Sequence, residues 1–198
     1  ILRVVTNLLQ PEHGAIELDV NTREIGFLFQ DDALLPWRTV RQNVTLGLRI
    51  RGAASGDADT QAEHWLTRLG LEGFGDRYPG QLSGGQRKRV AIAQVLALRP
   101  KLLLMDEPLA SLDASRKQEI LPFIERLRDH FHIPMVYVSH DMDEIIRLAD
   151  TLILIDEGRV AAMGSVEDLT SRLDLRPLTG RYAVSYTPFT LPTECQFF

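Results

Sequence analysis

An acidic pair, Asp106 and Glu107, directly follows the apolar run Leu102–Met105. An unbroken aliphatic run of this kind predicts a buried strand, and both carboxylates then lie at its end. In that position the first carboxylate could hold a divalent cation, and the second could orient and deprotonate a water molecule. The alternative is that the two acids only cap the helix that follows.

A glycine turn opens a second segment that could do chemistry. Leu82–Gln86 read Leu-Ser-Gly-Gly-Gln, and Arg87–Leu98 continue with apolar residues at helical spacing. Ser83 is predicted to cap this helix, whose free N–H groups and dipole attract an anion such as phosphate. Glycines at 84 and 85 allow close approach of the backbone. An ordinary turn that binds no ligand is the alternative.

Three further polar residues stand at predicted element ends. His140 follows the apolar run Met135–Val138 and Ser139, where it could donate a hydrogen bond to a phosphate oxygen. Gln30 follows the run Ile25–Phe29, where its amide oxygen could ligate a cation or position water. Asp113 precedes a predicted helix. Each also has a plain structural alternative, namely a structural histidine, a polar strand end and a helix N-cap.

The elements that position these residues alternate between strand and helix. Arg116–His130 carries apolar residues at helical spacing, interrupted by Pro122, and lies between two predicted strands. Strand, helix and strand in this order predict a parallel sheet, with ligands bound beyond the carboxyl ends of the strands. The predicted strands are Ile25–Phe29, Leu102–Met105, Met135–Val138 and Thr151–Ile155, the last ending at Asp156.

The remaining segments give weaker expectations. Residues 36–98 change in character, with amphipathic helical patterns and few β-branched runs, which predicts a helical subdomain. The expected helices are Ile1–Leu9, Val40–Ile50, Thr60–Leu69 and Val166–Leu173; Ala15–Asp19 is expected as an edge strand and Gly52–Asp59 as an exposed loop. Residues 176–198 show no usable periodicity.

Composition excludes several classes of function. The 198 residues carry 22 basic and 27 acidic side chains, a net charge of −5, which argues against a nucleic-acid surface. The single cysteine, Cys195, excludes an internal disulfide framework and multi-cysteine metal sites. The sequence contains no run of about 18 apolar residues, the length needed to cross a bilayer. Any link to a membrane is therefore expected through a partner.

The order of these motifs resembles the ATP-binding cassette (ABC) ATPases over residues 1 to 164. Gln30 is similar to the family's Q-loop glutamine, and Leu82–Gln86 match its signature loop. Leu102–Glu107 resemble Walker B with its catalytic glutamate, Ser111–Asp113 resemble the D-loop, and His140 falls at the switch histidine. The resemblance implies an α/β fold: a P-loop NTPase core with a mainly parallel sheet and an inserted α-helical subdomain.

The resemblance also implies a division of the chain. Residues 1–35 and 99–165 are expected to form a partial ATPase core, and residues 36–98 the helical subdomain that ends in the signature motif. Residues 166–198 are expected to form a C-terminal helix and an irregular tail.

What the family does implies the roles of the motif residues. The cofactors are ATP and Mg²⁺, and two ATPase subunits, identical or paired, clamp each nucleotide between them. The expected catalytic residues are Glu107, His140 and Gln30, the expected Mg²⁺ ligands are Asp106 and Gln30, and the residues expected at the nucleotide and dimer seam are Ser83, Gly84, Gly85, Gln86 and Asp113.

The segments Gln30–Trp37 and Tyr78–Gln86 resemble the importer branch of the family. This implies a cytoplasmic subunit, peripheral on the inner face of the cell membrane through a transmembrane permease, and served indirectly by a solute-binding protein. The helical segment 36–81 is where a permease would dock, with Trp37 as a candidate contact that could equally belong to the core. No nucleic-acid partner is expected.

One family motif is missing from the 198 residues. They contain no Gly-x-x-x-x-Gly-Lys, and the three lysines, Lys88, Lys101 and Lys117, all follow residues other than glycine. The chain is therefore expected to begin just after a P-loop, and these residues alone are expected to bind ATP weakly and hydrolyse it negligibly. The alternatives are a degenerate or fragmentary cassette without catalysis and, less favoured, a soluble ABC protein acting on DNA or ribosomes.

Overall fold

The computed structural model describes residues 2–131, 133–171 and 182–186, without the side chains of 130, 131 and 182–186. The chain forms two compact units. The first contains residues Ile1–Phe27, Lys101–Glu107 and Ile124–Phe198, and the second contains residues Leu28–Pro100 and Pro108–Phe123. The division predicted from the sequence, at residues 35 and 98, stays a prediction.

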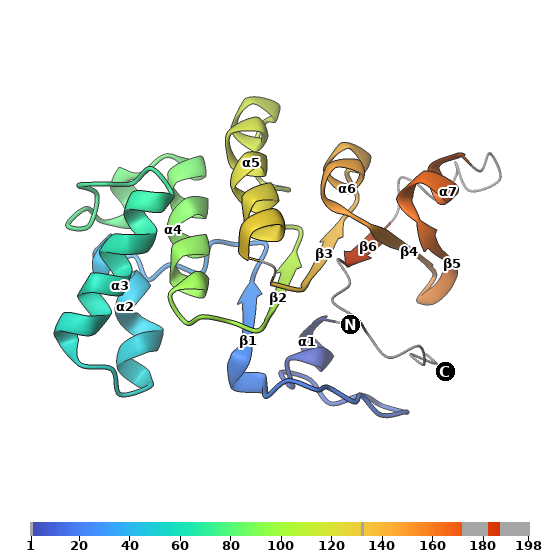
Figure 1. Ribbon diagram of the computed structural model, residues 1–198, viewed down its shortest axis with the longest axis horizontal. Coiled ribbons are helices and arrows are strands. Elements are labelled where there is room, and N and C mark those ends of the chain that lie inside the picture. The colour runs from blue at the N-terminus through green and yellow to red at the C-terminus, as the bar shows by residue number, and fades with distance from the viewer. Residues whose placement is uncertain (1, 132, 172–181, 187–198) are drawn as a thin grey trace. The chain divides into compact units, whose positions relative to one another are not determined.

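A six-stranded mixed sheet, drawn in Figure 1, is the main element of the first unit, with the strand order β1-β2-β3-β6-β4-β5. Strands β2 and β3 pair in parallel, with Asp106 opposite Val138, whereas β6 pairs antiparallel with both β3 and β4. The predicted strand, helix and parallel strand are therefore confirmed. The bounds are β1 Ile25–Leu28, β2 Leu102–Asp106, β3 Met135–Ser139, β4 Thr151–Asp156, β5 Arg159–Ser165 and β6 Tyr182–Tyr186.

Strands β5 and β6 were not expected from the sequence. Strand β5 forms an antiparallel hairpin with β4, and it alternates polar and small residues with few large apolar ones, so its pattern is weak. Strand β6 lies within residues 176–198, where no periodicity was recognised. The rest of that region lies outside the described residues.

Short helices and the sheet form the core of the first unit. Ile145 of α6 and Leu169 of α7 pack with Leu152 and Leu154 of β4, and all four side chains are buried. Residues 124–131 of α5 also belong to this unit. The helical bounds are α1 Leu2–Val5, the 3-10 helix Thr22–Glu24, α5 Ala114–Phe131, α6 Met142–Leu148 and α7 Val166–Ser171.

Helices make up most of the second unit. They are α2 Val40–Ile50, α3 Ser55–Arg68, the 3-10 helix Pro79–Gln81, α4 Gly84–Leu96 and the first half of α5. Helix α2 packs tightly on the end of the α4 segment, because a Cβ added at Gly47 would lie only 2.8 Å from Leu98 Cδ2. The apolar interior of this unit includes Val40, Val44, Ala58, Ala62, Leu66, Val90 and Ile92.

Two expectations for the first thirty residues are wrong. The helix expected over Ile1–Leu9 ends at Val5, since Asn7 adopts a left-handed conformation with φ of 59°, which asparagine tolerates better than most residues. Residues 15–19 form no strand, and all five are exposed, so alternating apolar residues alone did not recruit a partner strand.

The helical subdomain needed a smaller correction. Helix α2 has the expected bounds, but α3 begins at Ser55 rather than Thr60, so only the first residues of the expected loop Gly52–Asp59 are a loop. Arg49 of α2 holds Asp59 of α3 through an ion pair of 3.2 Å, which favours the longer helix. The expected helix Val166–Leu173 is present as α7, and residues 172 and 173 lie outside the described residues.

Candidate functional site

The end of β2 carries the acidic pair in a strained backbone. Glu107 has a φ of 44°, the left-handed region that residues other than glycine rarely adopt. Its N–H donates to Val138 O at 2.9 Å, which continues the β2–β3 ladder past Asp106. Its side chain is only 15% exposed, so most of it is packed against other protein atoms. Strain at such a position is typical of functional sites.

His140 lies beside this carboxylate. It follows β3, and its Nδ1 is 3.3 Å from Glu107 Oε2, with 53% of the imidazole side chain exposed. The parallel pairing of β2 and β3 therefore brings together two residues that are 33 positions apart in the sequence. Protonated, the imidazole would form an ion pair with Glu107; neutral, it could accept or donate a single hydrogen bond.

A buried hydrogen-bond network supports the turn that carries His140. Glu144 is almost fully buried, and its Oε2 accepts from the hydroxyls of Tyr137 at 2.7 Å and Ser139 at 2.8 Å. Ser139 Oγ in turn accepts from the N–H of Asp141 at 3.1 Å. Burial, together with the carboxylate of Glu144, raises the pKa of Tyr137 well above its ordinary value. The network was not recognised in the sequence; the only signal was an acidic residue on the apolar face of α6.

The start of α4 has the predicted cap. Ser83 Oγ accepts from the N–H of Gln86 at 3.2 Å, and Gln86 Oε1 accepts from the N–H of Ser83 at 3.0 Å, which completes a reciprocal capping box. Ser83 is exposed, whereas Gly85 is buried. The cap uses some of the free N–H groups and leaves the N–H groups of Gly84 and Gly85 in the first turn without a helical partner, as at every helix start.

The glycines of this turn are not explained by packing within the chain. Both lie in the helix with ordinary negative φ, since neither has a positive φ. A Cβ at Gly85 would meet Glu119 Oε2 at 3.8 Å, and a Cβ at Gly84 would meet Leu112 Cδ2 at 3.4 Å, which are ordinary contacts. A side chain is thus sterically acceptable at both positions, so packing within the described chain does not require a glycine there, and a ligand-binding role for the two glycines stays a prediction.

Asp113 caps the start of α5 beside the same turn. Its Oδ1 accepts from the hydroxyl of Ser115 at 2.7 Å and from the N–H of Arg116 at 3.0 Å. These hydrogen bonds, and then the charge of Arg116, hold the pKa of this exposed carboxyl below its ordinary value. The structural alternative for Asp113, an N-cap, is therefore present, and a role at a dimer seam stays a prediction.

Gln30 lies two residues past β1, in an exposed bend rather than at the last residue of the strand. Its carbonyl oxygen accepts from Lys88 Nζ at 3.0 Å, and the same Nζ lies 2.9 Å from Asp32 Oδ1. Lys88 was considered in the sequence only as a replacement for a P-loop lysine. A signal existed, because helical spacing places it with Gly85 and Ile92 on the buried face of α4.

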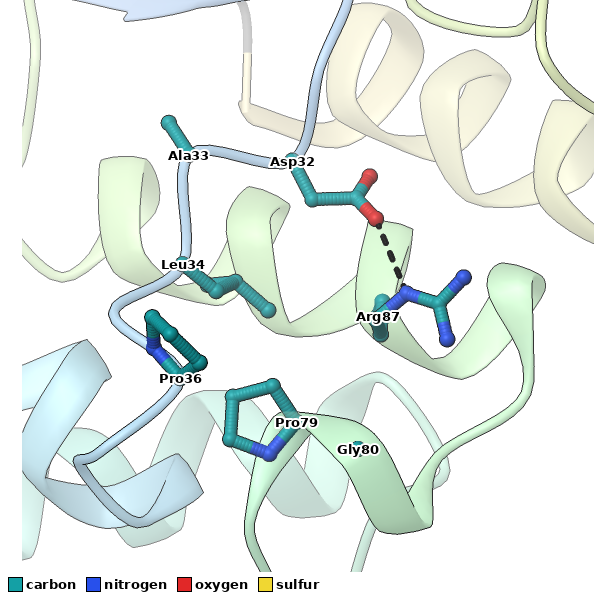
Figure 2. A pocket seen from close by; sticks show the side chains of 7 residues that line it. All are labelled: Asp32, Ala33, Leu34, Pro36, Pro79, Gly80 and Arg87. Carbon is teal, nitrogen blue, oxygen red and sulfur yellow. Dashed lines mark hydrogen bonds and ion pairs between the residues drawn. The ribbon is translucent and has the colours of Figure 1, made fainter.

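An open groove of about 390 Å³ adjoins this bend within the second unit (Figure 2). Figure 2 shows the Asp32 carboxylate and the Arg87 guanidinium joined along one side, with two prolines along the other. Trp37 and Tyr78, close in sequence to the lining residues, are among the exposed large side chains, and 71% of Trp37 is accessible. The lining residues are Asp32, Ala33, Leu34, Pro36, Pro79, Gly80 and Arg87.

Each unit separately offers groups of the kind that bind part of a nucleotide complex. Among the residues that the structure describes, no group of three or more His, Cys, Asp or Glu could hold a metal ion by itself. Mg²⁺ in phosphate sites needs less, since one or two carboxylates complement phosphate oxygens and water. Asp106 supplies such a carboxylate, and the capped glycine turn supplies N–H groups for phosphate.

Comparison with known proteins decides the family. The family model described as ABC transporter matches residues 1–110, more than half of the chain. The chain belongs to the ABC transporter family. This confirms the resemblance drawn from the motif residues.

Two curated relatives of this ABC chain illustrate the similarity. The molybdenum import ATP-binding protein ModC of Paramagnetospirillum magneticum is 42% identical over 196 residues, covering 92% of this chain and 53% of that protein. ModC 1 of Azotobacter vinelandii is 47% identical over 174 residues, covering 88% of this chain and 48% of that protein. The ABC chain therefore spans about half the length of the curated relatives it matches.

Solved structures confirm the α/β cassette fold for this ABC chain. The dimeric post-hydrolysis structure of the ATP-binding cassette MJ0796 bound to ADP and Pi has a TM-score of 0.71 and 30% identity, covering 83% of this chain and 78% of that one. CbiO1 from Clostridium perfringens, part of the ABC transporter complex cbiONQ, has a TM-score of 0.77 and 28% identity, covering 88% and 74%. Among the described helices of this chain, none is long and apolar enough to cross a membrane.

Proposed function

We propose that this chain belongs to the ATP-binding subunit of an importer, and that the subunit couples ATP hydrolysis to uptake of a molybdenum compound. The observation that carries the hydrolytic part is the approach of Glu107 and His140 to 3.3 Å at the ends of two paired parallel strands. The names of the curated relatives support the solute.

Glu107 is the proposed general base. The turn after β2 sets the position of its carboxylate. The carboxylate would orient a water molecule and accept a proton from it. His140 is proposed to contact the terminal phosphate of ATP, and its exposed imidazole beside Glu107 supports that role. Positioning of this kind accounts for much of the catalysis of phosphoryl transfer.

Asp106 and Gln30 are the proposed oxygen ligands for the cation that accompanies ATP. Mg²⁺ bound with the nucleotide would neutralise charge on the transferred phosphoryl group. Both residues present oxygen atoms, the ligand type that Mg²⁺ prefers. Gln30 is exposed in its bend, so its amide is free to turn towards such a ligand, while Lys88 holds its backbone.

The glycine turn of one subunit is proposed to act on the nucleotide of a second subunit. Residues 83–86 present a capped helix start, and Leu112, which precedes Asp113 in the sequence, lies 3.4 Å from a Cβ built at Gly84. The related cassette MJ0796 is dimeric. We therefore propose a dimer of ATPase subunits, with Asp113 at its seam.

The groove beside Gln30 is the proposed docking site of the permease, which would hold the subunit at the cytoplasmic face of the cell membrane. Its lining is mostly apolar, and the charged pair Asp32 and Arg87 stands at one side. Trp37 is exposed, which supports a contact with a partner rather than a place in the core. A solute-binding protein would act on the permease and only indirectly on this subunit.

Turnover of the assembled transporter in vesicles tests the function. ATP hydrolysis should rise when molybdate is present with the solute-binding protein, and should not rise with sulfate at the same concentration. Stimulation by sulfate alone would overturn the proposed solute. Absence of ATP turnover under all conditions would overturn the proposed hydrolysis.

Co-purification with the permease tests the docking site. Trp37→Ala combined with Leu34→Ala should release the permease from the ATPase subunit. Ile50→Ala is the matched control, since Ile50 is equally apolar, 78% exposed and outside the groove lining. Retention of the permease by the double variant, or its release by the control, would contradict this docking site.

A further inference from the structure

Lys88 of α4 is a completely buried charged side chain. Its side chain has 0% exposure, and it is the only lysine among the largest fully buried side chains of the described residues. An ammonium group removed from water is strongly unfavourable unless it is paired and hydrogen-bonded. Here Asp32 Oδ1 lies at 2.9 Å, and Gln30 O accepts from the same Nζ at 3.0 Å.

Asp32 extends this contact to the groove. Its other oxygen, Oδ2, accepts from Arg87 Nε at 3.3 Å, the contact drawn in Figure 2. Arg87 Nη1 also donates to Leu82 O at 2.9 Å, which fixes the guanidinium to the turn before α4. One carboxylate is therefore shared between a buried ammonium that holds Gln30 and a guanidinium that lines the groove.

The segment from Gln30 to Leu35 is also held at its second end, by contacts that do not involve Lys88. Asn43, fully buried in α2, accepts from the N–H of Leu35 at 2.8 Å, and its amide group donates to the carbonyls of Leu35, Arg38 and Thr39. Residues between the two fixed ends include Ala33, with a φ of 51°, and other groove-lining residues. Asn43 therefore holds the end of the segment at Leu35, and Lys88 holds the end at Gln30 and Asp32.

We propose that Lys88 is a positioning residue for Gln30: its ammonium fixes the Gln30 peptide and, through Asp32, ties that peptide to the charged side of the groove. The proposal rests on the proposed function, in which Gln30 contributes an amide to the nucleotide site. A carbonyl held at one atom sets the orientation of its peptide, and hence the direction in which the Gln30 side chain leaves the backbone.

A purely structural ion pair would have different consequences. Buried ion pairs add little stability compared with apolar or neutral residues of similar volume, whereas removal of one partner leaves an uncompensated buried charge. Stability should therefore fall in Lys88→Met and recover when Asp32→Asn is added. Orientation of the Gln30 peptide should not recover, because methionine at position 88 cannot replace the donor that Lys88 Nζ provides to the Gln30 carbonyl.

Hydrogen exchange of the 198-residue chain distinguishes a positioning role of Lys88 from a purely structural ion pair. Amides of residues 29–34 should exchange on the order of ten-fold faster in Lys88→Met and in Lys88→Met/Asp32→Asn, while thermal unfolding returns towards that of the wild type only in the double variant. Lys101→Met is the matched control, since Lys101 pairs with Glu24 at 2.8 Å but is 65% exposed. It should change neither readout.

Three outcomes of this measurement decide against the proposal. They are wild-type exchange in Lys88→Met, recovery of both stability and protection in the double variant, and faster exchange of the same amides in Lys101→Met. If Lys88→Met does not fold, the double variant is compared with Asp32→Asn, because the two differ only at residue 88 and both lack the pair of Asp32 with Arg87.

ATP turnover of the transporter provides the second readout. In Lys88→Met, which leaves the groove lining unchanged, kcat should fall about ten-fold with little change in the KM for ATP, because a displaced positioning group slows the reaction more than it weakens binding. An unchanged kcat beside faster exchange would show that the Gln30 orientation does not serve turnover, and would overturn the proposal. A wild-type transporter without any turnover would defeat the proposed function instead, and the exchange measurement would still decide what Lys88 holds.

Discussion

The end of β2 and the start of α4 carry the two halves of the candidate chemistry, and they are built in opposite ways. Glu107 sits in a left-handed backbone with a φ of 44° and a side chain that is 15% exposed. The turn Ser83–Gln86 has ordinary helical glycines, a complete capping box and room for a side chain at Gly85. The backbone at Glu107 is strained, whereas the backbone of the turn Ser83–Gln86 is relaxed and has room for a side chain at Gly85.

This difference indicates two kinds of cost. A strained non-glycine residue lowers stability in return for a fixed carboxylate, and a helical glycine lowers stability in return for an open surface. If both costs serve function, relieving either one should stabilise the protein and impair ATP turnover. The predictions below test each region in turn.

The largest effect is expected for Glu107→Gln, which keeps the shape of the side chain and removes the base. Turnover should fall by about 10²- to 10⁴-fold, the usual contribution of a general base, and an ATP-bound dimer should accumulate. Single-turnover kinetics and size-exclusion chromatography of the transporter's ATPase subunit measure both. Unchanged turnover would refute the role given to Glu107.

Glu157→Gln is the matched control for this variant. Glu157 is also a glutamate with a left-handed backbone, with a φ of 47°, but it lies in the turn between β4 and β5. Its replacement should leave turnover at the wild-type level, so that a loss in both variants would point to a general effect of removing an acid.

Tyr137→Phe tests the support beneath His140 and should cost about 1–2 kcal/mol of unfolding free energy. The change removes one of the two hydroxyls that donate to the buried Glu144 carboxylate. Chemical denaturation at neutral pH measures the loss. Wild-type stability in this variant would mean that the Tyr137 hydroxyl adds nothing to the stability of the buried Glu144 carboxylate.

The same variant has a defined pH signature. Because burial raises the pKa of Tyr137 in the folded state, the unfolded chain loses this proton first, from its ordinary value of 10.0 upwards. The wild type therefore loses stability as the pH rises above about 10, and below that value the contribution is fully present. Tyr137→Phe should show a smaller decline over this range, and an equal decline would contradict the shift.

The strand ends and the signature turn could be predicted because their signals are local. Aliphatic runs gave β2 and β3 with nearly their observed bounds, and Ser83 was recognised as a cap from its neighbours alone. Local signals failed at residues 15–19, where an apolar alternation found no partner strand, and at β6, whose pairing with β3 and β4 is entirely non-local.

The contacts around the site were hidden for the same reason. The approach of His140 to Glu107 depends on the register of two strands, and the pair of Lys88 and Asp32 joins residues 56 positions apart in the sequence. No spacing rule predicts which carboxylate reaches a buried lysine. The sequence could indicate only that Lys88 lies on the apolar face of the helix that follows the turn Ser83–Gln86.

Glu107→Gly addresses the strain directly and should raise the unfolding free energy by about 0.5–1 kcal/mol. A left-handed conformation costs an ordinary residue about 1–2 kcal/mol, and the greater unfolded entropy of glycine offsets part of the gain. Turnover should be lost along with the base. Glu157→Gly should give a similar gain without loss of turnover, and destabilisation by Glu107→Gly would show that the turn is not strained.

The smallest effect concerns the relaxed region. Gly85→Ala should raise the unfolding free energy by about 0.5 kcal/mol, since alanine is the better helix former and its Cβ would lie 3.8 Å from Glu119 Oε2, an ordinary contact. ATP turnover should nevertheless fall, because the added methyl group occupies the space proposed for a phosphate. Gly47→Ala is the contrasting glycine: its Cβ would lie 2.8 Å from Leu98 Cδ2, so the same substitution should destabilise by about 1–3 kcal/mol. Denaturation of both variants beside turnover decides whether Gly85 is kept for a ligand, because a glycine kept only for packing would behave like Gly47.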